Sequence, residues 1–263
     1  MSKIYRLGWA PELPSIKDWK MSVHPKNDTV VPPVSEDRRV RNPPVRDQGN
    51  LGSCVGFSVT YGQGWLRRTD RDKLDTTYSP LQMYYDARVR DGAQWKDVDA
   101  GAYIRDAMDS LREVGVAPET SWPYKIKRFA NKPTPSTYKA AKRWKLGAHW
   151  RCETLDDMQT ALALGFALIG GIVCYDSMFT RQVEKFGRIP MPIRTDTIVG
   201  GHALYFDMYD SYKKEFRFMN SWGTGWGDKG YGTIDYAYLA DRNLADDFWA
   251  MESESPETTP WKD

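Results

Sequence analysis

The stretch from residue 54 to about residue 68 constrains the fold more than any other part of the chain. It reads CVGFSVTYGQGWLRR, and its apolar side chains fall on nearly every side of an α-helix. A helix that is apolar all round packs on all sides, so this stretch predicts a central buried helix. Gly56, Gly62 and Gly64 each cost about 1 kcal/mol of helix propensity, which indicates that neighbouring backbones pack closely against the helix.

A cysteine stands at the junction between this helix and the glycine-punctuated turn before it, PVRDQGNLGS. At a helix N-terminus Cys54 faces unpaired N–H groups and the positive end of the helix dipole, which favour a nucleophilic thiolate. Gln48, six residues upstream, could bring its side-chain amide beside the sulfur and, with the backbone N–H of Cys54, hold a developing oxyanion. Since an isolated buried cysteine is more often a small hydrophobe, this half of an acyl-transfer site needs a base to complete it.

The chain offers three histidines as that base. His24 lies in a proline-rich segment and is predicted at the surface, while His149 is predicted as a packed histidine near a strand start. His202 follows a glycine pair and opens an apolar run, so it begins a buried strand. Asn220 ends a second strand further on. A hairpin between these strands would place His202 and Asn220 close together.

These motifs, followed by the run NSWGTGWG, resemble the papain-like cysteine peptidases, the cathepsin family, in a bacterial or phage-type form without a helical propeptide. The spacing of 148 residues from Cys54 to His202 fits the roughly 130–150 residues of that family. By position, the resemblance implies Cys54 as nucleophile, His202 as base and acid, and Asn220 as the group that orients His202. It also implies Gln48 as oxyanion donor and Trp222 as a lid over the His202–Asn220 hydrogen bond.

The function implied by the resemblance is that of a cysteine endopeptidase, a hydrolase that cleaves peptide bonds through a thioester and needs no cofactor. The sequence itself has no metal-ligand spacing and no phosphate-binding loop. Two alternatives stay open: a papain-like amidase or acyltransferase that acts on a non-protein amide, and a structural component of a larger assembly such as a virion.

Substrate is expected to bind at a glycine-containing edge and at the rim of the catalytic residues: Gly101, Ala102, Tyr103, Gly201 and Trp222. The alternative for residues 99–104 is an ordinary helix N-terminus. Leu51 and Val55 depart from the family pattern, which has a half-cystine and a tryptophan at these places. The first departure removes a disulfide and the second changes the packing beside the thiolate.

The expected fold is α+β, with a helical half and an antiparallel, β-barrel-like half that enclose the active-site cleft. Helices are predicted at 54–68, 80–90, 102–114 and 155–165, and strands at 166–173, 202–209, 215–219, 230–235 and 247–251. The expected regions are an extended arm (1–43), the helical half (44–135), the β-rich half (136–252) and a polar tail (253–263).

The arm holds six prolines, together with Trp9 and Trp19, and shows no helical period, so it is predicted to be extended. Two interpretations carry equal weight. Residues 1–40 lie along the cleft and inhibit the enzyme intramolecularly, or they form a strand that closes the back of the barrel.

The net charge of +2 gives no support for a nucleic-acid or membrane partner, which leaves a peptide or protein substrate and an unknown oligomeric state. Residues 1–9 lack the apolar core of a secretory signal. The odd number of cysteines favours a reducing compartment, although Cys152 and Cys174 could pair. The expected location is the cytoplasm, or a route of release or assembly without a Sec signal, with a virion still open.

Overall fold

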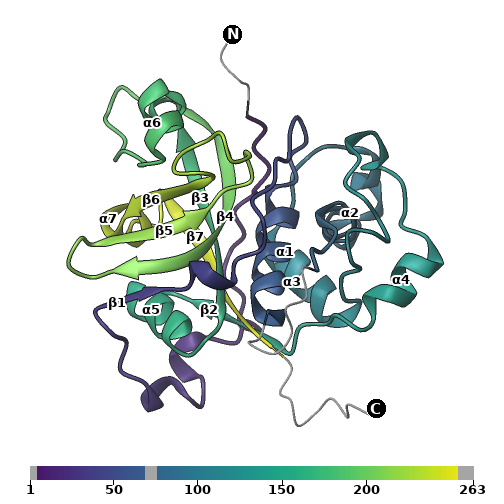
Figure 1. Cartoon of the computed structure of the whole chain (residues 1–263), viewed down its shortest axis with the longest axis horizontal. Helices are drawn as coiled ribbons and strands as arrows, with labels where there is room; N and C mark the ends of the chain where they lie inside the picture. Colours follow the sequence, from purple (N-terminus) through teal and green to yellow (C-terminus); the bar gives the residue numbers. More distant parts are fainter. Residues whose placement is uncertain (1–4, 69–75, 254–263) are drawn as a thin grey trace.

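The computed structural model describes residues 5–68 and 76–253, and the chain forms two lobes that lie side by side (Figure 1). One lobe is helical and contains α1 (Cys54–Arg67), α2 (Pro80–Asp91), α3 (Ile104–Glu113) and α4 (Pro135–Ala141). The other holds an antiparallel sheet with α5 (Leu155–Ala163), α6 (Arg181–Phe186) and α7 (Tyr236–Ala240). The predicted two-lobed α+β fold is confirmed. The predicted tail lies outside the described residues apart from residue 253.

The sheet contains these described strands: β1 (Ser35–Asp37), β2 (Ala148–Cys152), β3 (Ala167–Tyr175), β4 (Ile198–Asp210), β5 (Glu215–Met219), β6 (Tyr231–Asp235) and β7 (Ala245–Glu252). They follow the order β2-β7-β3-β4-β5-β6, with β1 paired to β4, and the pairings are antiparallel. The expected barrel-like form is wrong in that this sheet is open. Closure would require β2 to pair with β6, and these strands stand at opposite ends of the order.

The longer helices and the strands β3 to β7 agree with the sequence prediction, whereas the short helices are not predicted. The four predicted helices are α1, α2, α3 and α5, and the five predicted strands are β3 to β7. The sequence does not predict α4, α6 or α7, which have seven, six and five residues and are too short to show an amphipathic period. No helix in the described part of the chain has the length and apolar character needed to cross a membrane.

Close packing of neighbouring elements against α1 explains two of its glycines. A Cβ on Gly56 would lie 2.5 Å from the carbonyl oxygen of Pro80, at the start of α2. A Cβ on Gly62 would lie 2.6 Å from the sulfur of Met251, on β7. The central helix therefore contacts α2 on one side and the sheet on the other, as its sequence predicts.

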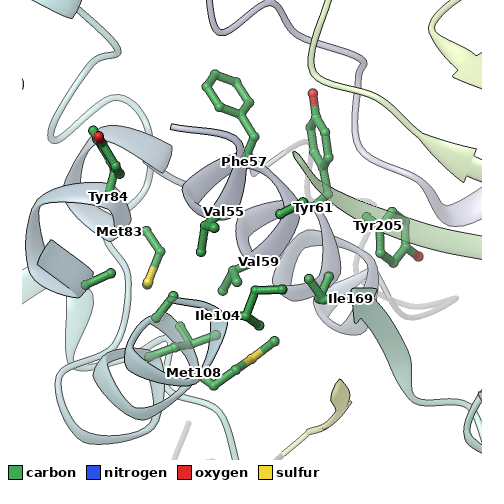
Figure 2. Packing of buried hydrophobic residues seen from close by; sticks show 14 of the residues in the cluster. Val55, Phe57, Val59, Tyr61, Met83, Tyr84, Ile104, Met108, Ile169 and Tyr205 are labelled. Carbon is green, nitrogen blue, oxygen red and sulfur yellow. The ribbon is translucent and has the colours of Figure 1, made fainter. Parts of the chain in front are cut away.

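The core around α1 joins both lobes (Figure 2). Val55 and Val59 lie on the side of α2 and α3, near Met83, whereas Ile169 of β3 and Tyr205 of β4 lie on the opposite side of the helix. This arrangement fixes the N-terminus of α1, and with it Cys54, against the sheet.

One histidine prediction is wrong. His24 is buried, because the proline-rich segment folds over the sheet and places this ring against the edges of Trp150 and Phe166, with ring centroids 4.5 and 5.1 Å apart. His149 is packed in β2 as predicted, with its ring centroid 5.2 Å from that of Trp249.

The N-terminal segment has two parts with different surroundings, and neither part closes the sheet into a barrel. Residues 5–10 run between the two lobes and hydrogen-bond to each of them (Figure 1). Further along, β1 adds a short strand to β4. The first part of the arm is therefore the part that approaches the cleft, and the later part belongs to the sheet.

Candidate active site

Cys54 is the first residue of α1 and is completely buried. Its sulfur accepts a hydrogen bond from the backbone N–H of Ala203 on β4, at 3.5 Å. One turn later, the hydroxyl of Ser58 donates to the carbonyl oxygen of Ala203 at 2.8 Å. Since Ala203 follows His202 directly, these bonds hold the strand that carries His202 against the first turns of α1.

His202 and Asn220 lie as the predicted hairpin requires. The ring Nε2 of His202 is 2.8 Å from Oδ1 of Asn220, which also accepts the backbone N–H of Ser221 at 2.8 Å. An oxygen that accepts from Ser221 accepts from the ring as well, so the hydrogen-bond network assigns the imidazole proton to Nε2. The opposite nitrogen, Nδ1, has no hydrogen-bond partner among the described residues and is left with a free lone pair.

Trp222 covers the imidazole. Its ring stacks on His202 with centroids 4.6 Å apart and an interplanar angle of 25°, and Trp226 packs edge-on behind it. Both tryptophans are buried. The ring of Tyr5 stacks on the indole of Trp222 at 4.3 Å, so the arm begins at this edge of the site.

Gln48 lies beside the nucleophile helix with its amide oriented from both ends. Its Nε2 donates to the carbonyl oxygens of Leu51, at 2.7 Å, and of Arg6 in the arm, at 3.0 Å. Its Oε1 accepts from the hydroxyl of Ser221 at 2.5 Å. Nε2 thus bonds to one carbonyl within the turn and to another in the arm.

The expected substrate-binding positions meet the backbone of the arm. The N–H of Ala102 donates to the carbonyl oxygen of Gly8 at 2.8 Å, and the carbonyl oxygen of Gly201 accepts from the N–H groups of Gly8 and Trp9, each at 3.0 Å. Gly101, with φ +83°, allows the turn that exposes this edge. Tyr103 is half-buried at the start of α3, where its carbonyl oxygen accepts from the N–H of Ala107.

A pocket for the Trp9 side chain is the part of the site that the sequence analysis missed. A Cβ on Gly171 would lie 2.0 Å from the indole, and a Cβ on Gly201 would lie 2.7 Å from it. The indole Nε1 donates to a carboxylate oxygen of Asp247 at 3.3 Å. A glycine pair inside the apolar run of β3 is the sequence signal for this close approach, whereas nothing local marks Asp247.

Burial keeps both reactive groups neutral in this arrangement. It raises the pKa of the Cys54 thiol to about 11, against the smaller lowering effect of hydrogen bonds from the N–H groups of Ala203 and Gly8. It lowers the pKa of His202 to about 4, opposed by the hydrogen bond to Asn220. A charged thiolate–imidazolium pair is therefore disfavoured in this arrangement.

The remaining cysteines lie outside the site chemistry. Cys152 and Cys174 are buried and free, so the pairing that the sequence left open is not formed. Among the described residues no cluster of His, Cys, Asp and Glu is arranged to hold a metal ion. Leu51 and Val55, the two departures from the family pattern, are both buried in the core beside α1.

Comparison with known sequences gives a consistent family. The papain family cysteine protease description matches residues 32–247. A peptidase C1-like protein of Acanthamoeba polyphaga mimivirus, uncharacterized, is 33% identical over 215 residues, which span 78% of this chain and 68% of that protein. Cathepsin K of Gallus gallus is 28% identical over 237 residues, which span 87% of this chain and 60% of cathepsin K.

Comparison with solved structures leads to the same family. Xylellain, a cysteine protease from Xylella fastidiosa, matches with a TM-score of 0.83 and 30% identity over 96% of this chain and 98% of xylellain. The proCathepsin B structure from Trypanosoma congolense, at 16% identity and a TM-score of 0.72 over 95% of this chain and 87% of that one, shows the shared fold alone. The matched region includes Gln48, Cys54, His202 and Asn220, and the chain belongs to the papain family of cysteine proteases.

Proposed function

We propose that this chain is a cysteine endopeptidase that hydrolyses peptide bonds, with Cys54 as nucleophile, His202 as base and acid, and Asn220 as the orienting group. The observation that carries the proposal is the His202–Asn220 hydrogen bond, because it places the ring proton on Nε2 and leaves Nδ1 as a proton acceptor. Asn220 thus takes the place that a carboxylate holds in other triads.

The proposed reaction follows from these positions. His202 takes the thiol proton, and the Cys54 sulfur attacks the carbonyl carbon of a substrate peptide bond. The Gln48 amide and the backbone N–H of Cys54 stabilise the oxyanion. His202 then protonates the departing amine, and water, deprotonated by His202, hydrolyses the thioester to release the acid and the free thiol.

We propose further that residues 5–10 inhibit the site within the same chain. The carbonyl oxygen of Arg6 occupies the Gln48 donor that the oxyanion needs, and the indole of Trp9 fills the pocket above Gly171. Trp9 and Ala102 form a parallel bridge, so the arm adds to the substrate-binding edge as an extra extended segment. A peptide substrate would have to displace this segment.

A single substitution at Gly8 tests the inhibition and the nucleophile together. A Cβ at this position would lie 1.9 Å from the carbonyl oxygen of Gly52, so Gly8→Ala should force the arm out of the cleft. We expect rapid alkylation of Cys54, mapped by mass spectrometry, together with hydrolysis of fluorogenic peptides. Deleting residues 1–40 is a poorer test, because it also removes β1 and the buried Arg38.

Two controls accompany the Gly8→Ala variant. Gly225→Ala makes the same chemical change where a Cβ meets nothing within 4 Å, and it should behave as the wild type. Gly8→Ala combined with Cys54→Ser should be inert to the alkylating reagent. Labelling of wild type and Gly8→Ala at equal rates would contradict inhibition by the arm, and absence of peptide hydrolysis by an alkylated, folded variant would contradict the peptidase.

We also propose that the protein works in a reducing compartment. The observation in support is that Cys54, Cys152 and Cys174 are all free thiols. Thiol counting on protein purified without reductant should give three free thiols; two missing thiols and a Cys152–Cys174 peptide would contradict this.

A further inference from the structure

Asp99 lies where two parts of the cleft meet. Its Oδ1 accepts a hydrogen bond from the backbone N–H of Gly52 at 2.9 Å and another from the hydroxyl of Tyr84, on α2, at 2.6 Å. The same hydroxyl accepts the N–H of Gly101 at 3.2 Å. One carboxylate oxygen therefore links the turn before Cys54 to the edge that binds extended backbone.

The contact with Gly52 reaches the oxyanion donor through a single rigid group. The carbonyl of Leu51 and the N–H of Gly52 belong to the same planar peptide unit. At one end the Leu51 oxygen accepts from Nε2 of Gln48 at 2.7 Å, and at the other the Gly52 N–H donates to Asp99. Rotation of this peptide would turn the Leu51 oxygen away from Nε2 of Gln48 and leave the amide oriented only by its contacts with Ser221 and Arg6.

The other contacts of the turn hold different atoms. The hydroxyl of Tyr124 donates to the carbonyl oxygen of Gln48 at 2.8 Å and lies 2.7 Å from the hydroxyl of Ser53. These bonds hold the ends of the turn. The peptide between Leu51 and Gly52 is held at its carbonyl end by Gln48 and by the backbone N–H of Ser53, which donates to the Leu51 oxygen at 2.8 Å, and at its N–H end by Asp99. Since glycine at 52 imposes little conformational preference of its own, the acceptor at the N–H end helps to select the peptide orientation.

We propose that Asp99 is a positioning residue of the oxyanion hole. It holds the Leu51–Gly52 peptide in the orientation that aims the Gln48 amide, and through Tyr84 it keeps the Gly101 edge in register with that amide. Its second oxygen, Oδ2, faces the arm and accepts from Nε of Arg6 at 3.3 Å, so release of the arm leaves the positioning oxygen unchanged. The inference rests on the proposed peptidase function.

A mutant cycle in the Gly8→Ala protein tests the inference. Loss of one oxyanion donor costs roughly 100–1000-fold in turnover, and we expect Asp99→Ala to lower kcat by about 10–100-fold through misaligned Gln48. The decisive measurement is the kcat of the double variant. Once Gln48→Ala is present, Asp99→Ala should lower kcat little further, because both substitutions act through the same hydrogen-bond donor. Multiplicative effects of the two substitutions would overturn the proposal.

Two further variants separate positioning from general damage. Asp99→Asn keeps an oxygen acceptor but removes its charge, so turnover should fall only about 2–5-fold, and this fall should vanish in the Gln48→Ala background. If Asp99→Ala does not fold, Asp99→Asn and Gln48→Ala provide the same double-mutant cycle. Tyr84→Phe removes the link to Gly101 and should raise KM more than it lowers kcat. Loss of activity in Asp99→Asn equal to that in Asp99→Ala would also overturn the proposal.

The rate of Cys54 alkylation by iodoacetamide distinguishes failure of this inference from failure of the proposed function. Alkylation needs the thiolate but no oxyanion donor, so it should be unchanged in all Asp99 variants while peptide hydrolysis falls. A Gly8→Ala parent that is alkylated but hydrolyses no peptide defeats the proposed function. An active parent with an unaffected Asp99→Ala variant defeats the positioning role alone.

Discussion

At the scale of single residues, the site depends on how hydrogen-bond partners orient two side chains. Asn220 accepts from both His202 and Ser221, which assigns the imidazole proton to Nε2. Ser221 also donates to Oε1 of Gln48, so its hydroxyl orients that amide. One short segment, residues 220–221, therefore orients both His202 and Gln48, the proposed base and the proposed oxyanion donor.

Replacing Gln48 tests the residue with the clearest single role. In the Gly8→Ala protein, Gln48→Ala should lower kcat by roughly 100–1000-fold, because it removes a donor that is aimed at the developing charge. Gln63→Ala is a matched control, since Gln63 is another buried glutamine, on α1, whose amide donates to Trp144 and Lys145. It should leave peptide turnover unchanged. Turnover by Gln48→Ala within a few-fold of its parent would remove the oxyanion role.

The pH dependence of Cys54 alkylation tests the neutral state of the site. The thiol pKa is raised to about 11, so the thiolate is a small minority at neutral pH and its fraction rises as the pH rises toward 11. Alkylation of the wild type should therefore accelerate about tenfold per pH unit across the neutral range. The Gly8→Ala protein should instead reach a plateau at lower pH, where imidazolium pairs with thiolate. Identical pH profiles for the two proteins would contradict this account.

At the scale of elements, the glycines of α1 leave room for neighbouring elements to pack closely against the helix. Gly56→Ala gains helix propensity, yet its Cβ would lie 2.5 Å from the fixed carbonyl oxygen of Pro80. We expect a net loss of about 1–3 kcal/mol in the free energy of unfolding, measured by denaturant titration. Gly64→Ala, in the same helix, meets only side-chain carbons of Pro43, at 3.3 to 3.8 Å, and should be nearly neutral. Equal stability of the two variants would refute the packing argument.

The elements also show where sequence patterns stop being informative. The long apolar helix and the hairpin of β4 and β5 can be predicted because their signals are local and periodic. Cys54 and Asn220 can be predicted as candidates because they begin a helix and follow a strand, and Gln48 and His202 because a glycine stands next to each of them. Asp99 cannot, since only the fold brings it to Gly52, Tyr84 and Gly101.

The open sheet is a further feature that local patterns do not decide. The apolar runs of β3 and β4 predict buried strands, but the pairing order depends on which strands meet at long range. The position of His24 has the same origin: a proline-rich segment predicts an extended chain and carries no information about the surface that it covers.

At the scale of the whole molecule, the arm connects the two lobes through charged as well as apolar contacts. Arg105 on α3 pairs with Glu12 and, at 3.0 Å, with Asp18 of the arm. Arg151 on β2 lies 3.8 Å from Asp18 and 3.0 Å from Asp247, which also accepts the Trp9 indole N–H. Residues 5–18 are therefore fastened to both walls of the cleft.

This fastening has a mechanical consequence. Because Gly8 hydrogen-bonds to Ala102 in one lobe and to Gly201 in the other, the segment between the lobes also links the two walls of the cleft. Under the proposed inhibition, displacing the segment would expose Cys54 and, by the same event, remove hydrogen bonds that join the two walls. The active form would then be the looser form, with a working lifetime limited by the step that switches it on.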